Sequence, residues 1–510
     1  MSGDGQLPRY DVVVIGAGPN GLTCAAYLAR AGATVAVLEK RFEWGGTLTS
    51  DDYSTPFLYN ISQFQLPLGR ELVPYADFDL ASEGVRFVEP AIVVRLEAPG
   101  RPALVVDRSG AALGPAVEAL VAQAEALTPY LYAAPLPEAE VRRDLAAQGA
   151  SALVDFADRP PRGIVAALGG DLEAAAVRYL LALVGHLEGD RPIGLLGAYQ
   201  LARLFRSSIV EGGSKTLANA IYRVAARHGA RVFTNADVSG MEAAGDGLAT
   251  LLVDGRRLLS KTVVSTLDPV TSLAALPSTD LSRERFRSLA GTWRNTGAGI
   301  FTAHFGVKAD LADPTRPPAL FEIVGFSGLA DVERYLEEVG RNTLPARIAG
   351  HGTVTSLLDP RQSSSGPYGP LHTVRFQTLV PREPAEGWRG SRQEYRRRTY
   401  AALAPALGLP EQPLFEFADT PLDIDRRFRT VGGWPNRGAL IAGQVFVDRP
   451  HRDCSAGRTP IPGYYLGGNA IHPGIPGSLG GGYRAAAVVA ADLGLEPSAR
   501  PAATHAAAAI

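Results

Sequence analysis

The sequence predicts an α/β fold in which helices connect the strands of a buried parallel sheet. Two short apolar runs rich in β-branched residues, 10–15 and 34–38, are typical of buried parallel strands. Between them lie a glycine-rich turn and a helical pattern of apolar residues that ends at 31–32. Strand, turn, helix and strand in this order form the unit from which doubly wound sheets are built.

The composition indicates a globular protein of more than one domain. The 510 residues leave room for two or three domains, and 46% of them are hydrophobic, which is enough for a substantial core. A formal net charge of −2 gives no reason to expect a nucleic-acid partner. The two cysteines match neither a disulfide framework nor a zinc spacing, and the sequence contains no nucleophile elbow or Walker loop. We therefore expect no metal site.

The sequence also gives an expectation for localisation. The polar N-terminal segment runs directly into a strand without a signal segment, and no run of 18 apolar residues could cross a bilayer. We expect a cytoplasmic protein, with peripheral contact to a membrane left open. The oligomeric state stays unknown at this point, and the alanine-rich segment 496–510 is expected to be disordered.

The turn after the first strand has the GxGxxG spacing of a dinucleotide-binding site, formed by Gly16, Gly18 and Gly21. The first glycine allows the tight turn, the second lets a pyrophosphate approach the backbone, and the third lets the helix pack on the sheet. The start of the helix, with Pro19 and Asn20, directs N–H groups and the positive end of the helix dipole at the phosphates. Glu39, at the end of the second strand, can accept both hydroxyls of an adenosine ribose.

A Gly-Gly pair follows this acid, in a segment that contains Lys40, Gly45, Gly46 and Thr47. The arrangement resembles the second fingerprint of FAD enzymes of the amine oxidase and carotenoid desaturase superfamily, in which the pair lines the path of the flavin's ribityl and pyrophosphate groups. Many members have arginine after the pair, whereas this chain has Thr47. It therefore resembles a phytoene-desaturase-like branch in which small residues follow the pair. The resemblance implies FAD as the cofactor.

The middle of the chain returns to the same α/β pattern. A Gly-Gly segment at 211–215 opens a helix that ends at 228–229, and a strand begins at 231–233. A hairpin is predicted from 249–253 and 257–259 around Asp254-Gly255, and 262–266 is predicted as a further buried strand. The resemblance implies that the main chain of Val238 lies against the adenine.

The C-terminal region reads as a turn, a strand and a glycine-rich loop over 459–474, followed by a helix from 483 to 493. In phytoene-desaturase-like flavoproteins the matching segment closes over the isoalloxazine ring with a His-Pro-Gly loop. The loop between Gly474 and Pro476 is about two residues shorter here than in the carotenoid desaturases. The resemblance implies flavin contacts in this region from Gly468, Asn469, Pro473, Gly474, Gly477, Ser478 and Leu479.

The resemblance covers nearly the whole chain and implies its domain organisation. A Rossmann-like FAD-binding domain would be assembled from 1–75, 206–290 and 425–495. The segments 76–205 and 291–424 would form an α+β substrate-binding domain with a mixed or antiparallel sheet. The apolar helical pattern at 174–187 is interpreted as a core helix, with the wall of a substrate tunnel or a membrane-surface helix as alternatives.

Catalysis would depend on the flavin, with the protein orienting a C–H bond over flavin N5 and excluding water. His472 is the candidate catalytic residue because its loop would lie beside the ring, and a structural role is the alternative. The other histidines near plausible sites are His351, His372 and His304, of which the last has the strand context of a core residue.

The leading hypothesis is an FAD-dependent oxidoreductase that desaturates a carbon–carbon bond of a lipophilic or polyene-like substrate by hydride transfer to flavin N5. One GxGxxG motif implies no separate NAD(P)H domain, so electrons would pass to an external acceptor such as oxygen or a quinone. An amine oxidase and a redox-neutral carotenoid-type isomerase share the fold and remain alternatives. A prenyl-group carrier without flavin is the non-enzyme alternative, against which the intact glycine motif argues.

Overall fold

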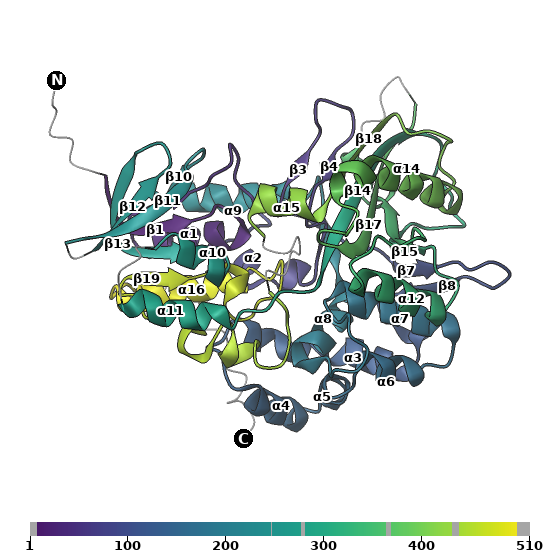
Figure 1. Cartoon of the computed structure of the whole chain (residues 1–510), viewed down its shortest axis with the longest axis horizontal. Helices are drawn as coiled ribbons and strands as arrows, with labels where there is room; N and C mark the ends of the chain where they lie inside the picture. The colour runs from purple at the N-terminus through teal and green to yellow at the C-terminus, as the bar shows by residue number, and fades with distance from the viewer. Residues whose placement is uncertain (1–7, 246, 277–280, 364–368, 431–437, 497–510) are drawn as a thin grey trace.

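The computed structural model describes residues 8–245, 247–276, 281–363, 369–430 and 438–496. These residues form two seven-stranded sheets, which lie at the left and the right of Figure 1, with a group of helices below them. Of the C-terminal tail 496–510 that was expected to be disordered, residues 497–510 lie outside the described residues. The predicted α/β fold with a second, mixed sheet is confirmed.

The first sheet has the parallel centre that the sequence predicts. β1 (Arg9–Ile15) lies between β2 (Val35–Leu38) and β13 (Arg257–Ser265), and β10 (Arg231–Phe233) pairs with the far side of β2. All three pairings are parallel, and α1 (Pro19–Arg30) connects β1 to β2. The side chains at the centre of β1 and β2 are buried, as expected for a sheet covered on both faces.

β13 carries two different partners along its other edge. Its first half pairs with the antiparallel β12 (Gly247–Leu252), which pairs in turn with β11 (Val238–Ala244), and its last residues pair with the parallel β19 (Tyr464–Leu466). The sequence predicted two strands where β13 is one continuous strand, so that division was wrong. Pairing with β1 runs from 259 to 265 without a break and keeps the polar stretch at 260–261 extended.

The second sheet is mixed, with one parallel pair, β15 with β7, among antiparallel ones. Its strands come from 92–107 and 298–419. In spatial order they are β18 (Phe415–Asp419), β14 (Ala298–Lys308), β17 (Leu371–Pro381), β16 (Gly350–Val354), β15 (Ala319–Val324), β7 (Ile92–Leu96) and β8 (Leu104–Asp107).

Three helices pack together beside the first sheet, and three more pack together beside the second sheet. α9 (Lys215–Arg227) and α16 (Gly480–Asp492) both pack against α1, and α7 (Asp171–Leu183) packs against α8 (Gly194–Arg206) and α12 (Leu329–Gly340). α7 is buried over most of its length, as the core-helix interpretation expects. It ends four residues before the predicted boundary of 187, because the chain turns at Gly185 with φ 103°.

The remaining elements are short or peripheral. The small sheets are β3 (Ser50–Asp51) with β4 (Tyr59–Asn60), and β5 (Gln65–Leu66) and β6 (Phe87–Val88) on either side of β9 (Ser208–Val210). The other helices are α2 (Val73–Asp77), α3 (Pro115–Gln123), α4 (Glu138–Ala147), α5 (Ser151–Ala157), α6 (Pro161–Ala166), α10 (Pro269–Ala274), α11 (Leu281–Gly291), α13 (Thr355–Leu358), α14 (Trp388–Leu407) and α15 (Pro421–Phe428).

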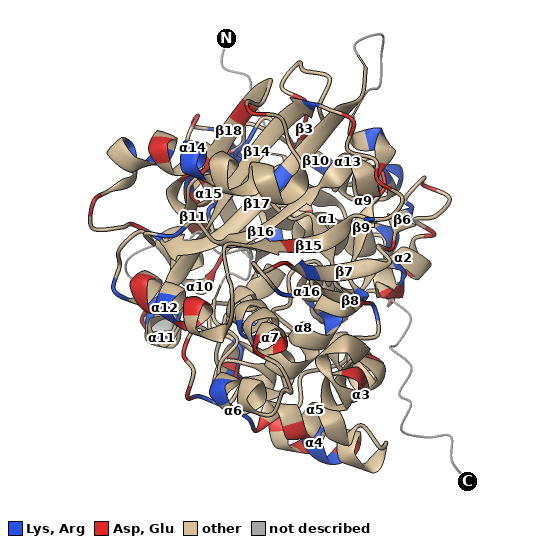
Figure 2. Ribbon diagram, turned by 90° about the vertical axis from the view of Figure 1, so that its right-hand side faces the viewer, with Lys and Arg blue, Asp and Glu red and all other residues tan. Residues whose placement is uncertain are grey.

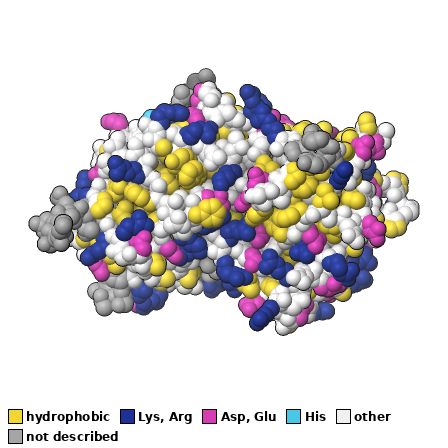
Figure 3. Space-filling model, turned by 90° about the horizontal axis from the view of Figure 1, so that it is seen from above, with side chains coloured by type: hydrophobic (Ala, Val, Ile, Leu, Met, Phe, Trp, Pro, Cys, Tyr) yellow, Lys and Arg dark blue, Asp and Glu magenta, His cyan; other side chains and the backbone are white. Residues whose placement is uncertain are grey.

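The surface carries both charge signs in close mixture. Figure 2 shows acidic and basic residues side by side along α14 and across the neighbouring helices. In the view from above, hydrophobic side chains form separate patches interrupted by charged groups (Figure 3). Within the described ranges, no helix combines the length and the apolar character needed to cross a membrane.

The first turn of α16 touches backbone from two other segments. A Cβ atom at Gly482 would lie 2.1 Å from the carbonyl oxygen of Asn20 in α1, and one at Gly481 would lie 1.8 Å from the carbonyl oxygen of Gly468. Real Cβ atoms cannot come this close to a backbone oxygen, so these positions require glycine for α16 to reach α1.

We expect Gly482→Ala to lower the free energy of unfolding by about 1–3 kcal/mol, because the added methyl group forces α16 away from α1. Gly390→Ala is the matched control, since Gly390 lies exposed in α14 with nothing within 4 Å of its Cβ position. The control is expected to be neutral or slightly stabilising, since alanine favours a helix over glycine. Thermal unfolding of both variants measures the difference, and equal midpoints would contradict the packing argument.

Candidate functional site

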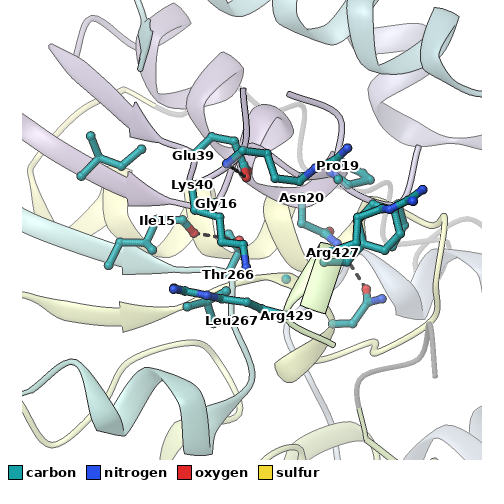
Figure 4. A pocket seen from close by; sticks show the side chains of 18 of the residues that line it. Ile15, Gly16, Pro19, Asn20, Glu39, Lys40, Thr266, Leu267, Arg427 and Arg429 are labelled. Carbon is teal, nitrogen blue, oxygen red and sulfur yellow. Dashed lines mark hydrogen bonds between the residues drawn. The ribbon is translucent and has the colours of Figure 1, made fainter. Parts of the chain in front are cut away.

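A cavity of about 850 Å³ lies where the carboxyl ends of β1 and β2 meet the start of α1 (Figure 4). The edge formed by the carboxyl ends of parallel strands is where α/β sheets bind their ligands. Most of the predicted cofactor residues line this cavity: Gly16, Gly18, Pro19, Asn20, Glu39, Lys40, Gly46, Thr47, Val238, Gly468, Asn469 and Gly477.

The glycines of the turn have separate roles in shaping this cavity. At Gly16, with φ 96°, a Cβ atom would lie 2.6 Å from Thr266 Oγ1, and at Gly21 one would lie 1.9 Å from the carbonyl oxygen of Gly16. At both positions, other atoms of the protein therefore occupy the space that a side chain would need. At Gly18 the nearest atom to a Cβ position is Gly46 Cα at 3.9 Å, so the backbone is open to the cavity there. A phosphate group could approach the backbone at this point.

Glu39 is held in a fixed orientation at the end of β2. One carboxylate oxygen accepts a hydrogen bond from the backbone N–H of Ala17 and the other from that of Arg41, both at 2.9 Å. A carboxylate has about four lone-pair positions, so it keeps acceptor capacity after these two bonds. Glu39 lies at the strand end on the wall of the cavity, where its carboxylate could accept hydrogen bonds from both hydroxyls of a ribose.

Asn20 connects the two helices that begin at the cavity. Its side-chain oxygen accepts from the backbone N–H of Gly482 in α16 at 2.9 Å, and its amide nitrogen donates to the side-chain oxygen of Asn469 at 3.2 Å. The N-cap of α1 is Gly18, which supplies no side-chain cap, so first-turn N–H groups remain available to a ligand. The cavity therefore combines a helix dipole with backbone donors, the arrangement that suits a pyrophosphate.

Six predicted cofactor residues do not line the cavity: Gly21, Gly45, Pro473, Gly474, Ser478 and Leu479. Gly45 donates its N–H to the carbonyl of Ala17 at 2.8 Å and so fixes the Gly-Gly loop against the first turn. Ser478 donates its hydroxyl to the carbonyl of Ile475 at 2.8 Å and receives the N–H of Gly480 at 3.2 Å. In this structure these residues shape the loops behind the cavity wall.

His472 is also absent from the cavity lining. Its side chain is 1% exposed, and Nε2 donates to the carbonyl of Tyr130 at 2.7 Å, while the ring stacks on Phe446 at a centroid distance of 5.6 Å. Burial lowers the pKa of His472 to about 4, which keeps the imidazole neutral. These contacts attach the His-Pro-Gly loop to the segment around 130, which is what the structural alternative for His472 expects.

Several residues that line the cavity were not identified from the sequence. Figure 4 shows Arg427 and Arg429 across the cavity from Glu39, together with Thr266 and Leu267 at the end of β13. Arg429 forms an ion pair with Asp237 at 2.6 Å, which joins the end of α15 to the start of β11. Asp237 precedes Val238 directly, so a role for Val238 could have drawn attention to it. Arg41 and Gln63 also line the cavity.

A second cavity of about 840 Å³ adjoins the first, since Gln63 lines both. It lies among α7, α8, the second sheet and the segment 62–67. The polar members of its lining are Ser62, Gln63, Gln65, Tyr199, Gln200, Arg203, Ser207, His351 and Gln377, and the rest are apolar or proline. Of the four histidines considered from the sequence, His351 is the one that lines either of the two cavities.

His351 and Tyr179 form a buried pair at the wall of the second cavity. The Tyr179 hydroxyl and His351 Nδ1 are hydrogen-bonded at 2.9 Å, and His351 is 5% exposed. Burial, with a smaller contribution from the Arg375 guanidinium, lowers the pKa of His351 to about 3. The imidazole is therefore uncharged at neutral pH. Accepting a proton would place a positive charge in a buried site.

Comparison with known proteins gives the family. Residues 20–493 match the family described as flavin containing amine oxidoreductase. This match extends over more than nine tenths of the chain. The protein belongs to that family. It is an FAD-dependent oxidoreductase, with a small-molecule substrate and an electron acceptor.

Individual relatives agree with this membership. The oxidoreductase is 28% identical to a limonene dehydrogenase subunit of Castellaniella defragrans, with 96% of each chain covered. It is 27% identical to pyridine nucleotide-disulfide oxidoreductase domain-containing protein 2 of Rattus norvegicus, over 95% of this chain and 94% of that one. A putrescine oxidase bound to putrescine shares the fold, with a TM-score of 0.60 and 17% identity, over 96% of this chain and 99% of that one.

We expect Glu39→Ala to weaken FAD binding about 10- to 100-fold, because it removes a charged hydrogen-bond acceptor from the cavity wall. Glu242→Ala is the control, since Glu242 lies exposed on β11 of the same sheet and pairs with Arg257. The ratio of flavin to protein after dialysis measures the effect. Full flavin occupancy in Glu39→Ala would remove Glu39 from the cofactor site.

The buried histidines predict that the free energy of unfolding decreases as the pH is lowered through the weakly acidic range. Burial lowers the pKa of His351 to about 3 and of His186 and His472 to about 4, whereas a histidine in an unfolded chain titrates near 6.5. Below about pH 6.5 the unfolded chain binds protons that the folded chain does not bind. Each of these groups therefore lowers the free energy of unfolding by about 1.4 kcal/mol for each further pH unit of acidification, down to its folded-state pKa.

The melting temperature should therefore drop between pH 7.5 and pH 5.5, and His351→Gln should reduce this drop. His228→Gln is the matched control because His228 is exposed at the end of α9. A melting temperature that stays constant or rises on acidification would contradict the expectation.

Proposed function

We propose that this oxidoreductase dehydrogenates a carbon–carbon bond of a neutral, lipophilic small molecule held in the second cavity. The observation that carries the proposal is that this cavity adjoins the first one at Gln63. A molecule in the second cavity would thus lie next to a cofactor in the first. The electrons would leave to an external acceptor, for which oxygen and a quinone are the candidates.

The residues of the first cavity are assigned by their geometry. We assign the open backbone at Gly18 and the N-terminus of α1 to the pyrophosphate, Glu39 to the ribose, and Val238 to the adenine. Gly468, Asn469 and Gly477 would then lie toward the flavin ring, on the side of the second cavity. FAD, when bound, supplies an acceptor for a hydride from a substrate carbon.

The charge in the second cavity favours a neutral substrate over an amine. Arg203 is the charged side chain among the described residues that line it, and its guanidinium lies 2.9 Å from Glu71. None of these lining residues is an aspartate or glutamate. An ammonium group would therefore lose its hydration without a carboxylate to compensate, which is unfavourable in a buried site.

The relatives support the same choice. The limonene dehydrogenase subunit, whose name contains a neutral hydrocarbon, matches nearly the whole chain at 28% identity. The putrescine oxidase matches over a similar length at 17% identity, which speaks for the fold alone. We therefore favour dehydrogenation of a neutral substrate and keep amine oxidation as an outcome of the test.

Dehydrogenation of a carbon–carbon bond also releases a proton from the carbon next to the one that loses hydride. We assign the acceptance of this proton to His351, because it lines the cavity and its neutral imidazole has a lone pair. The pKa of about 3 makes it a weak base, so it would hold the proton only transiently. Its bond to the Tyr179 hydroxyl fixes the ring and leaves Nε2 without a hydrogen bond to the described part of the chain. The cavity wall would exclude water from this proton transfer.

The first test is anaerobic mixing of the FAD-loaded enzyme with limonene, menthone, squalene, putrescine and cyclohexylamine. We expect loss of the oxidised-flavin absorbance with at least one of the three neutral compounds and with neither amine. Mass spectrometry should show a product that has lost two hydrogens. Reduction by the amines alone would replace the proposal by amine oxidation.

His351→Gln should slow flavin reduction about 100-fold while flavin content stays unchanged, as expected for loss of an acid–base group. The matched control is His372→Gln, because His372 bonds to Ser356 and lines neither cavity. Equal reduction rates in the two variants would remove His351 from proton transfer.

A further inference from the structure

The polar part of the second cavity is concentrated on facing surfaces of the second sheet and α8. His351 on β16 and Gln377 on β17 are direct partners across the strand pair, so their side chains lie on the same face of the sheet. Gln200 belongs to α8 and lines the same cavity. These three side chains are between 5% and 9% exposed, which makes them buried polar groups with few ways to reach solvent.

Each of the three has hydrogen-bonding capacity that the described chain does not use. Gln200 makes no hydrogen bond to the described residues, either through its buried Oε1 or through its amide nitrogen. Gln377 donates Nε2 to the hydroxyl of Thr302 at 3.0 Å, which leaves its carbonyl oxygen without a bond to those residues. His351 Nδ1 is hydrogen-bonded to the Tyr179 hydroxyl, and Nε2 has no hydrogen bond to the described residues. Buried polar groups in folded proteins are nearly always satisfied, so water or a ligand in the cavity would bond to this cluster.

We propose that the substrate of this enzyme carries a hydroxyl group, which accepts a hydrogen bond from the amide nitrogen of Gln200 and donates one to the amide oxygen of Gln377. This inference rests on the proposed function for the location of the substrate, and it adds the polar anchor. The rest of the molecule lies against the apolar wall of the cavity, which includes Leu183, Leu204, Ile300 and Ile475.

Amides and a neutral imidazole select for an uncharged oxygen. The amide nitrogen of Gln200 donates and the amide oxygen of Gln377 accepts, so a hydroxyl can bond to both, whereas a carbonyl could only accept. A carboxylate would need a free cation, and Arg203 is ion-paired with Glu71 and donates Nε to the carbonyl of Pro67 at 2.7 Å. A pure hydrocarbon would cover the polar groups without bonding to them, and each group left unpaired weakens binding about tenfold.

The test uses p-menthane and menthol, two compounds of one carbon skeleton that differ by a hydroxyl group. Equilibrium dialysis against the FAD-loaded full chain measures their affinities, and the change of the flavin absorption spectrum reports whether they reach the cofactor. We expect menthol to bind at least about tenfold more tightly than p-menthane. This comparison uses the natural sequence and does not depend on the folding of a variant.

Gln200→Leu and Gln377→Leu should reduce the advantage of menthol to less than about threefold and leave the affinity for p-menthane equal or higher. Gln148→Leu is the matched control, because Gln148 is exposed and lies outside both cavities. A variant that retains its flavin content and its melting temperature is folded, so its affinities report on the anchor.

Equal affinities for the two compounds would overturn the proposal, since the amides would then hold water rather than substrate. Absence of binding by both compounds would also overturn it. Neither result affects the proposed dehydrogenation, which fails separately if only amines reduce the flavin. Tight binding of menthol together with reduction by amines alone would support the oxygen anchor and reject dehydrogenation.

Discussion

The structure depends on a close approach of backbone segments around the first turn of α1. Gly18 lies against Gly46 of the loop after β2, and the start of α16 lies against Asn20 and Gly468 at distances that exclude a side chain. Segments from the two ends of the chain therefore meet at one helix N-terminus. Only this meeting brings the N–H groups of α1, the carboxylate of Glu39 and the amides of Asn20 and Asn469 to one cavity.

Local sequence patterns were sufficient for the elements that build this meeting point. The strand, turn, helix and second strand at 9–38 follow the apolar periodicity and the glycine spacing, and so do the hairpin of β12 and β13 and the helices α9 and α16. The errors lie where tertiary pairing extends or ends an element. β13 is continuous because β1 pairs with both of its halves, and α7 ends at a turn that only the packed structure requires.

The second cavity could not be predicted, because its wall comes from segments that are far apart in the sequence. Gln63, Gln200, His351 and Gln377 belong to a loop, a helix and two strands, and none stands in a recognisable motif. His472 was the candidate for catalysis because of its loop, yet its contacts are with Tyr130 and Phe446. His351 offered no comparable signal, since its importance comes from which face of β16 it occupies.

The boundary between the two cavities is held by buried arginines. Arg375 donates to the carbonyl oxygens of Asn60 and Ser62, and Arg203 donates to that of Pro67, so the loop around Gln63 is attached at both ends. Burial lowers the pKa of Arg375 to about 9, and the guanidinium is still charged at neutral pH. A buried cation is stable only with its hydrogen bonds made, so movement of this loop would expose an unsatisfied charge.

A fixed loop at this place has a consequence for the proposed reaction. Hydride transfer requires a donor carbon and an acceptor to stay within a few tenths of an ångström of one geometry, and much of the rate in such reactions comes from this positioning. In this protein the cofactor side is shaped by glycines that admit no side chain, and the substrate side is shaped by a loop that two guanidinium groups hold in place. Rigid walls on both sides of Gln63 would therefore help to position the reacting atoms.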